Sequence, residues 1–285
     1  MTDSPLKFRP AEACRWDVAA LGEVMLRLDP GEGRVRTARR FDVWEGGGEY
    51  NVARALAKGF GRRAAIVTAL PRNDLGLLVD DLMAQGSVDR RHVVWRDWDG
   101  VGRNTRVGLN FTERGFGVRP AKGTSDRANS AASQFRPDEV DWARLFGAEG
   151  VRWFHTGGIF AALSETSAET ALAAVQVARA HGVIVSFDLN YRASLWSAHA
   201  DPEAARRVGR VIARYVGGMC GDAWGFRQCL GLDVDPGADL DVAAEAYARE
   251  FPDVRIVAAT RRRAETAGRN DWAAAAWCDG STVRS

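Results

Sequence analysis

The stretch Val183-Ile184-Val185-Ser186-Phe187-Asp188-Leu189-Asn190-Tyr191-Arg192 decides the fold prediction, because an apolar run passes directly into a run of polar side chains. Residues 183–187 are mainly apolar or β-branched, which is typical of a strand buried in a parallel sheet. Residues 165–181 are alanine-rich with apolar positions at helical spacing, and Gly182 separates them from the strand. The sequence therefore predicts a helix, a turn and a strand, with polar residues at the carboxyl edge of the sheet, where ligands bind in open α/β folds.

The polar residues after this strand are candidates for a binding site. Asp188, Asn190 and Arg192 are spaced by two, so in an extended segment their side chains point the same way. An acid, an amide and a guanidinium on one face can bind a polyhydroxylated or anionic small molecule. A strand-end salt bridge followed by a turn explains the pattern equally well, and the spacing alone leaves both interpretations open.

Length and composition exclude several classes of protein. The chain has 285 residues, enough for one large α/β domain with a small appendage. Its 39 lysine and arginine residues nearly balance 37 acidic residues, so we expect no nucleic-acid partner. The first ten residues lack the apolar core of a signal peptide, and no later run approaches membrane-spanning length, so we expect no membrane association. The four cysteines lack CxxC spacing and the four histidines are scattered, so we expect a cytoplasmic protein without a metal site.

Strands and helices alternate along the chain. Apolar runs predict strands at 16–21, 24–28, 41–45, 64–70, 151–155, 183–187, 216–220, 254–259 and 273–277, and helical spacing predicts helices at 52–57, 74–84, 137–145, 165–181, 202–215, 226–230 and 240–251. This alternation predicts an α/β fold, a three-layer, doubly wound, mostly parallel sheet.

Residues 93–118 differ from this pattern. Short alternating runs are separated there by glycine, aspartate and arginine, which predicts a small antiparallel sheet inserted in the α/β domain. Such a sheet can cover a cleft as a lid, although a peripheral hairpin is equally compatible with the pattern. Residues 124–133, which follow, are small and polar and are predicted to form a turn.

A glycine cluster precedes the first long helix. Gly46, Gly47 and Gly48 permit close approach of a ligand to the backbone and leave free N–H groups at the helix start. The cluster is not the dinucleotide fingerprint, which needs G-x-G-x-x-G directly after a strand. It is not a Walker A loop either, because no Gly-Lys-Ser/Thr follows.

Three strings in this order resemble the ribokinase-like (PfkB) carbohydrate kinases and, within them, the 2-keto-3-deoxygluconate kinases. They are Gly46-Gly47-Gly48-Glu49-Tyr50-Asn51, Asp126-Arg127-Ala128-Asn129-Ser130-Ala131-Ala132-Ser133 and Asp188-Leu189-Asn190-Tyr191-Arg192-Ala193-Ser194-Leu195-Trp196. The resemblance covers essentially the whole chain. It implies a ribokinase-like fold with a β-sheet lid, and phosphorylation of a sugar hydroxyl by ATP with Mg²⁺.

The resemblance also implies roles for individual residues. Candidate substrate-binding residues are Gly47, Asn51, Asn110, Arg127, Asp188, Asn190 and Arg192, and candidate nucleotide-binding residues are Asp222 and Thr260. Arg127 and Arg192 would grip the acid end and the keto group of a sugar acid, because paired guanidinium groups suit a carboxylate. Family members commonly dimerise through the lid, so a homodimer of this kind is expected as an option.

The sequence departs from the family pattern in two places. Gly225 stands where the family carries a glutamate that helps to hold Mg²⁺ and phosphate, and Asp222 is a partial substitute. The Gly-Ala-Gly-Asp turn, which forms an anion hole and supplies the general base, has no counterpart in the sequence. We therefore expect residues 1–285 to form a single domain incomplete at its C-terminus, with no catalytic base and negligible kinase activity; Asp188 is the first alternative base.

Three other functions were weighed against a 2-keto-3-deoxygluconate kinase. A non-catalytic sugar-acid-binding or regulatory relative would keep the pocket and lose the chemistry. A ribose or nucleoside kinase is disfavoured, because a neutral substrate would leave the two arginines poorly paired. An NAD-dependent dehydrogenase is improbable without the glycine fingerprint.

Overall fold

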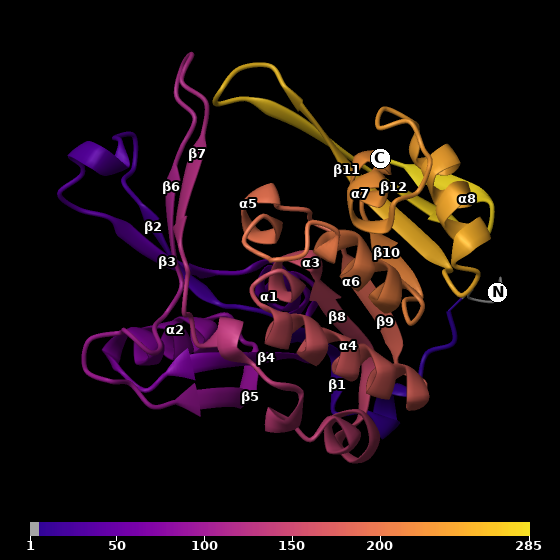
Figure 1. Ribbon diagram of the computed structural model, residues 1–285, viewed down its shortest axis with the longest axis horizontal. Helices are drawn as coiled ribbons and strands as arrows, with labels where there is room; N and C mark the ends of the chain where they lie inside the picture. The colour runs from indigo at the N-terminus through magenta and orange to yellow at the C-terminus, as the bar shows by residue number, and fades with distance from the viewer. Residues whose placement is uncertain (1–5) are drawn as a thin grey trace.

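A nine-stranded sheet forms the centre of the computed structural model, which describes residues 6–285 (Figure 1). The strand order is β13-β12-β11-β10-β9-β8-β1-β4-β5, and all pairs from β11 to β5 are parallel. Strands β12 and β13 add an antiparallel edge. The bounds are β1 Trp16–Leu21, β4 Ala64–Pro71, β5 Asp89–Arg96, β8 Val151–Gly157, β9 Ile184–Asp188, β10 Gly218–Cys220, β11 Ile256–Ala264, β12 Asn270–Cys278 and β13 Ser281–Arg284.

Helices cover both faces of this sheet, which confirms the predicted three layers. In β1, Val18 and Ala20 pack in the core under α1 and α2, whereas Ala19 and Leu21 belong to the core under α4. Successive residues of a strand face opposite sides, so a strand covered on both faces is apolar throughout. The helices are α1 Gly48–Phe60, α2 Asp74–Gln85, α3 Gly158–Ala161, α4 Glu165–Ala180, α5 Ala193–Trp196, α6 Ala204–Ala213, α7 Ala223–Leu230 and α8 Leu240–Glu250.

Five short helical segments of the described residues lie before or between these elements. They are η1 Ala11–Ala13, η2 Val35–Thr37, η3 Ala132–Gln134, η4 Pro137–Glu139 and η5 Arg144–Gly150. The helix predicted at 137–145 is thus divided into a 3₁₀ turn and a π-helix. Between residues 6 and 285, no helix is both long and apolar enough to cross a membrane.

A separate four-stranded sheet, which we call the lid, has the order β3-β2-β6-β7. Its strands are β2 Met25–Asp29, β3 Asp42–Gly46, β6 Leu109–Glu113 and β7 Lys122–Asp126. The lid therefore comes from two segments far apart in the sequence, which differs from the expected insertion at 93–118. Residues 93–95 lie in β5 and pair with β4 of the large sheet.

Strand β7 corrects a second expectation, because residues 124–126 were predicted to be part of a turn. These residues pair with β6 in antiparallel register, from Leu109 opposite Asp126 to Glu113 opposite Lys122. Backbone pairing with β6 satisfies the hydrogen-bonding groups of a segment with weak strand propensity. Local composition does not report such pairing.

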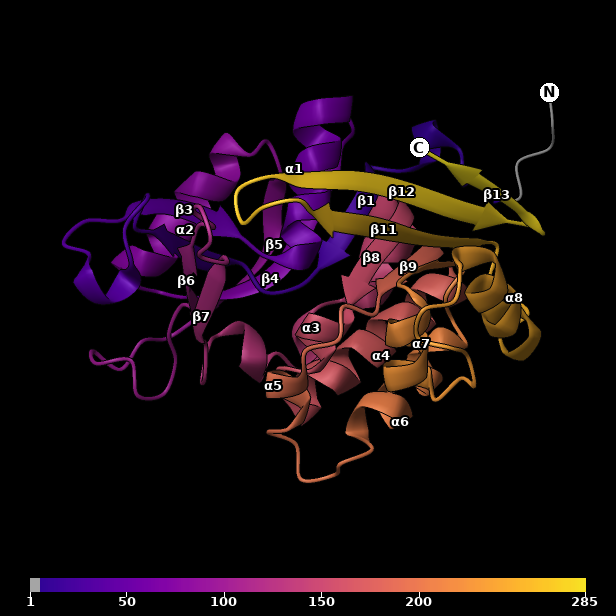
Figure 2. The same cartoon turned by 90° about the horizontal axis from the view of Figure 1, so that it is seen from above.

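The β11–β12 hairpin extends beyond the large sheet to the tip of the lid (Figures 1 and 2). Gly115, in the β6–β7 turn, lies against Ala267 at the hairpin tip. A Cβ atom placed on Gly115 would be 2.0 Å from the carbonyl oxygen of Ala267, so no side chain fits there. The hairpin and the lid are therefore in backbone contact.

The core under α4 gives a test of the fold. Phe154 of β8 is fully buried, with its ring 5.0 Å from that of Phe146 in an edge-to-face arrangement. We predict that Phe154→Ala lowers the free energy of unfolding by about 3–5 kcal/mol, because it leaves a cavity between sheet and helices. Urea denaturation measures this loss. Phe60→Ala, at the exposed end of α1, is the control and should change it by less than about 0.5 kcal/mol; equal effects would contradict the packing.

Candidate functional site

Glu23, which follows β1, lies where the strands of the lid join the large domain. Its carboxylate accepts a hydrogen bond from Arg127, the residue after β7. A Cβ atom on Gly108, just before β6, would lie 2.7 Å from Glu23 Oε1, and one on Gly47, just after β3, would lie 1.9 Å from the Glu23 carbonyl oxygen. Since β2 begins two residues after Glu23, this residue lies at the base of all four lid strands.

A cavity of about 520 Å³ lies between the lid and the large domain. Its lining contains six of the seven predicted substrate-binding residues, namely Gly47, Asn51, Asn110, Arg127, Asn190 and Arg192. The lid contributes Arg27, Asn110 and Ser125 to the same lining. We call this space the lid cavity. Its volume is in the range of small-molecule sites.

The seventh residue, Asp188, lines a second cavity of about 780 Å³. The two predicted nucleotide-binding residues, Asp222 and Thr260, line it too. Asn190 and Arg192 line both cavities. The two cavities are thus neighbours, and a ligand in each would lie beside the same two side chains.

The segment after β9 is not extended. The prediction that Asp188, Asn190 and Arg192 point the same way assumed an extended segment, so this assumption is wrong. Strand β9 ends at Asp188, and Asn190 has a φ of +32°, close to the left-handed region that asparagine tolerates better than most residues. Asn190 and Arg192 line both cavities, whereas Asp188 lines only the second one. The three residues therefore share the second cavity, and Asp188 is not part of the lining of the lid cavity.

The two predicted arginines carry different charge environments. Arg127 is largely buried and forms an ion pair with the buried carboxylate of Glu23. Arg192 donates one hydrogen bond, 3.0 Å long, to the Tyr191 carbonyl oxygen, and within residues 6–285 it has no carboxylate partner at ion-pair distance. Arg127 thus already has an anionic partner, whereas the binding of an acid by Arg192 stays a prediction.

Two buried carboxyl groups beside the cavities have raised pKa values. Burial raises the pKa of Glu49 to about 7, and the nearby charges of Asp188 and Glu23 add to the effect. The Glu49 carboxyl lies between the ends of β1 and β8, because Cβ atoms on Gly22 and Gly157 would lie 2.3 and 2.8 Å from its oxygens. Burial also raises the pKa of Asp188 to about 6, although a hydrogen bond from the Asn190 N–H group and the charge of Arg192 both lower it.

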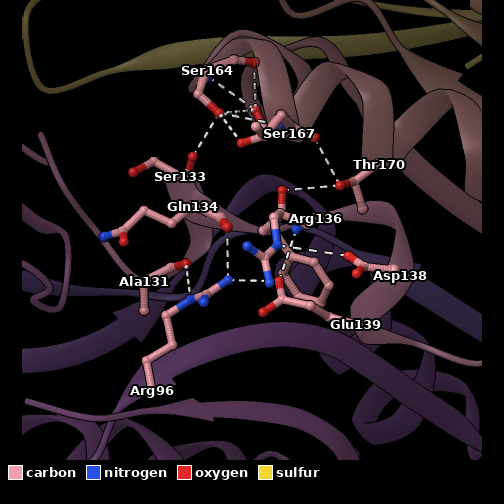
Figure 3. Close-up of polar contacts among 12 residues, drawn as sticks. Arg96, Ala131, Ser133, Gln134, Arg136, Asp138, Glu139, Ser164, Ser167 and Thr170 are labelled. Carbon is pink, nitrogen blue, oxygen red and sulfur yellow. Dashed lines mark hydrogen bonds and ion pairs between the residues drawn. The ribbon is translucent and has the colours of Figure 1, made fainter.

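The chain that returns from the lid is fastened to the domain by a polar network (Figure 3). Arg96, at the end of β5, donates to the carbonyl oxygens of Ala131 and Gln134 at 3.0 and 2.7 Å, and to Glu139 at 2.6 Å. On the other side, Ser164 at the start of α4 donates to the Ser133 carbonyl oxygen at 2.6 Å. Residues 130–135 therefore hold the segment that carries Arg127, and Ser130, Ala131, Ala132 and Phe135 among them are buried.

The second cavity can hold a nucleotide but supplies few metal ligands. Its wall is formed by alanines of β11 and β12, an apolar surface suited to a base. Asp222 caps α7, since its Oδ1 accepts from the Gly225 N–H at 2.8 Å, which leaves Oδ2 for a ligand. In the described part of the chain, no three His, Cys, Asp or Glu side chains gather as a metal site. The residues thus fit a nucleotide that brings its own Mg²⁺.

Three residues of the site were not identified from the sequence. Glu23 follows a predicted strand without any functional motif, and Glu49 belongs to the glycine-rich string, in which only the glycines and Asn51 suggest a role. Arg27 lies on a short apolar run, where nothing marks it as facing a ligand. The available signal is that a charged residue interrupts an otherwise apolar strand.

Comparison with known proteins identifies the family. A protein-family profile described as pfkB family carbohydrate kinase matches residues 16–214, well over half of the chain. The chain belongs to the pfkB family of carbohydrate kinases. It is 34% identical over 246 residues to a 2-dehydro-3-deoxygalactonokinase of Haloferax volcanii, covering 86% of this chain and 71% of that protein.

Two further proteins are similar to the chain. The chain is 29% identical over 192 residues to a 5-dehydro-2-deoxygluconokinase of Shouchella clausii, covering 67% of this chain and 56% of that protein. The crystal structure of a 2-dehydro-3-deoxygluconokinase from Thermotoga maritima superposes with a TM-score of 0.82 at 32% identity, covering 94% of this chain and 78% of that one. The ribokinase-like fold predicted from the sequence is confirmed.

The raised pKa of Glu49 predicts how the stability of this kinase depends on pH. Between 4.5, the ordinary value, and about 7, the folded protein keeps a proton that the unfolded chain has lost, so stability falls as the pH rises through this window. Glu49→Gln removes this fall. We predict that, from pH 4.5 to 7.5, the variant gains about 3 kcal/mol of unfolding free energy relative to the wild type.

Urea denaturation at several pH values measures this difference. Glu169→Gln, on the exposed side of α4, is the control for the loss of a carboxylate. A wild type and a Glu49→Gln variant with parallel pH profiles would show that the Glu49 carboxyl is ionised and solvated in the folded protein.

Proposed function

We propose that this pfkB kinase acts on a 2-keto-3-deoxy sugar acid of the gluconate or galactonate type, with ATP and Mg²⁺ as the phosphate donor. The observation that carries the proposal is Arg192, a cation without a carboxylate partner that lines both cavities. A guanidinium in this setting favours an anionic ligand. The names of the Haloferax and Thermotoga relatives agree with this class of substrate.

The remaining lining of the lid cavity is suited to hydroxyl and keto groups. Asn51 and Asn190 have no side-chain hydrogen bond within the described residues and can bind sugar oxygens through their amides. Asn110 donates to Ser125 Oγ at 2.9 Å and accepts from Thr112, which holds its amide on the inner side of the lid. The first N–H groups of α1, after Gly47, add donors at the positive end of the helix dipole.

The second cavity is proposed to take the nucleotide. Asp222 and Thr260 would hold it, beside the alanine wall. The bound nucleotide with its Mg²⁺ supplies the phosphoryl group. Asp188, with a pKa of about 6, lies in this cavity next to Asn190 and Arg192 and is the proton acceptor that these residues offer to a sugar hydroxyl.

One observation favours a second function, a sugar-acid-binding relative without catalysis. Gly225 has no side chain at the position where the family carries a glutamate, and Asp222 uses one oxygen to cap α7. Both functions require the same acid-binding site, so ligand binding tests the substrate class and an ADP-release assay separates the two. Dimerisation through the lid is a further proposal, supported by the exposed Trp44 and Phe116.

The substrate proposal predicts the effect of replacing Arg192. Arg192→Gln should weaken binding of 2-keto-3-deoxygluconate by about 1.5–3 kcal/mol, because a charged hydrogen bond to the carboxylate is lost. Isothermal titration calorimetry measures this, with 3-deoxyfructose, in which a hydroxymethyl group replaces the carboxylate, as the neutral ligand. Arg214→Gln, on the exposed end of α6, is the control. A wild type that binds the neutral sugar as tightly as the acid would refute the proposal.

A further inference from the structure

The inner face of the lid carries an arginine with no assigned role. Arg27 of β2 is in register with Asn110 of β6, which is in register with Ser125 of β7. Residues in register on neighbouring strands have their side chains on the same face of a sheet. All three line the lid cavity, so this row faces the ligand site.

The side chain of Arg27 passes over a glycine of the neighbouring strand β3. A Cβ atom placed on Gly46 of β3 would lie 2.4 Å from Arg27 Cδ and 3.4 Å from its Nε. Gly46 does not have a positive φ, so its backbone does not require glycine. The missing side chain instead provides the space that the arginine stem occupies, beside the glycines at the start of α1.

The guanidinium of Arg27 is unpaired within the described residues, whereas those of Arg106 and Arg114, which flank β6, have carboxylate partners. Arg106 pairs with Asp126, and Arg114 pairs with Asp29. For Arg27, the structure of residues 6–285 contains neither an ion pair nor a side-chain hydrogen bond. Arg27 is exposed, so water satisfies its five donors and the guanidinium is available to an anionic ligand in the cavity.

The charges around the lid cavity leave two cations for a ligand. Glu23 neutralises Arg127, and Arg106 neutralises Asp126, the acidic residue in the lining. Arg27 and Arg192 remain, one on the lid and the other on the large domain. An anionic group between them would contact both sides of the cavity.

We propose that Arg27 is a substrate-binding residue that, with Arg192, clamps the carboxylate of the ligand between lid and domain. This inference rests on the proposed function, since it concerns the acid end of the same substrate. It assigns acid recognition to Arg27 and Arg192, and leaves Arg127, fixed by Glu23, to contact neutral oxygens. Acid binding then draws the lid toward the domain, which a neutral sugar does less well.

The test compares two ligands in four proteins. Calorimetry is carried out with 2-keto-3-deoxygluconate and with 3-deoxyfructose on the wild type, Arg27→Gln, Arg27→Lys and Arg39→Gln. Arg39, in the β2–β3 connection, is an exposed lid arginine outside the cavity lining and serves as the control. We expect Arg27→Gln to bind the acid about 10- to 100-fold more weakly and the neutral sugar within about twofold of wild type. Arg27→Lys should retain part of the acid affinity, because the charge remains but the fork is lost.

The outcomes separate this inference from the proposed function. If the wild type prefers the acid and Arg27→Gln binds it as the wild type does, the role of Arg27 is refuted and the substrate class stands. If Arg27→Gln weakens both ligands equally, Arg27 shapes the lid and does not bind an anion, which also refutes the inference. If the wild type shows no preference for the acid, the proposed function itself fails. Thermal unfolding of each variant verifies that it is folded, and Arg27→Lys carries the test should Arg27→Gln be unstable.

Discussion

The base of the lid and the lid cavity are both bordered by the ion pair between Glu23 and Arg127. The side chains are only 3% and 12% exposed, so neither charge can be solvated by water if the other is removed. Removing one partner of a buried ion pair typically lowers the free energy of unfolding by about 3–5 kcal/mol, because the other charge is left buried without a partner. Because Glu23 also touches the chain just before β6 and just after β3, the pair fixes the base of the whole lid. Above this base, only Leu26 of β2 and Leu109 of β6 among the described lid residues reach the core, and Arg27, Asn110 and Ser125 line the cavity.

Buried carboxyl groups are concentrated at the edge of the sheet that borders the two cavities. Glu23 and Arg127 compensate each other, whereas Glu49 and Asp188 have no cation at ion-pair distance within the described residues and respond with raised pKa values. Buried carboxyl groups with raised pKa values lower the stability of the folded protein near neutral pH. Such groups are common at functional sites, where activity depends on them. Here the strain lies at the carboxyl ends of β1 and β9, on the same edge of the sheet as both cavities. The core on either side of the sheet contains few polar side chains and supplies the stability.

The sequence predicted the large sheet well and the lid poorly, for a physical reason. Strands β1, β4, β8 and β9 are buried on both faces, so their residues are apolar wherever the register falls, and periodicity reveals them. Lid strands are covered on one side only, and β7 contains Gly123, Thr124 and Ser125, whose strand conformation comes from pairing with β6. The same limit applies to the site. The polar run after β9 is visible locally, but the partner of Arg127 is 104 residues earlier in the chain. A charge that is neutralised at such a distance looks like a free cation in the sequence.

The β11–β12 hairpin connects the lid to the second cavity. Ala258 and Ala276 of this hairpin form part of the alanine wall, while its tip touches Gly115 in the β6–β7 turn. One hairpin therefore contacts the lid at one end and borders the second cavity at the other. A lid that moves toward the large domain must either carry the hairpin tip with it or break the contact at Gly115. In the first case the wall of the second cavity shifts with the lid. In the second case the free energy of that contact opposes closure. Only in the first case are the position of the lid and the shape of the second cavity energetically coupled, and such a coupling acts equally in both directions.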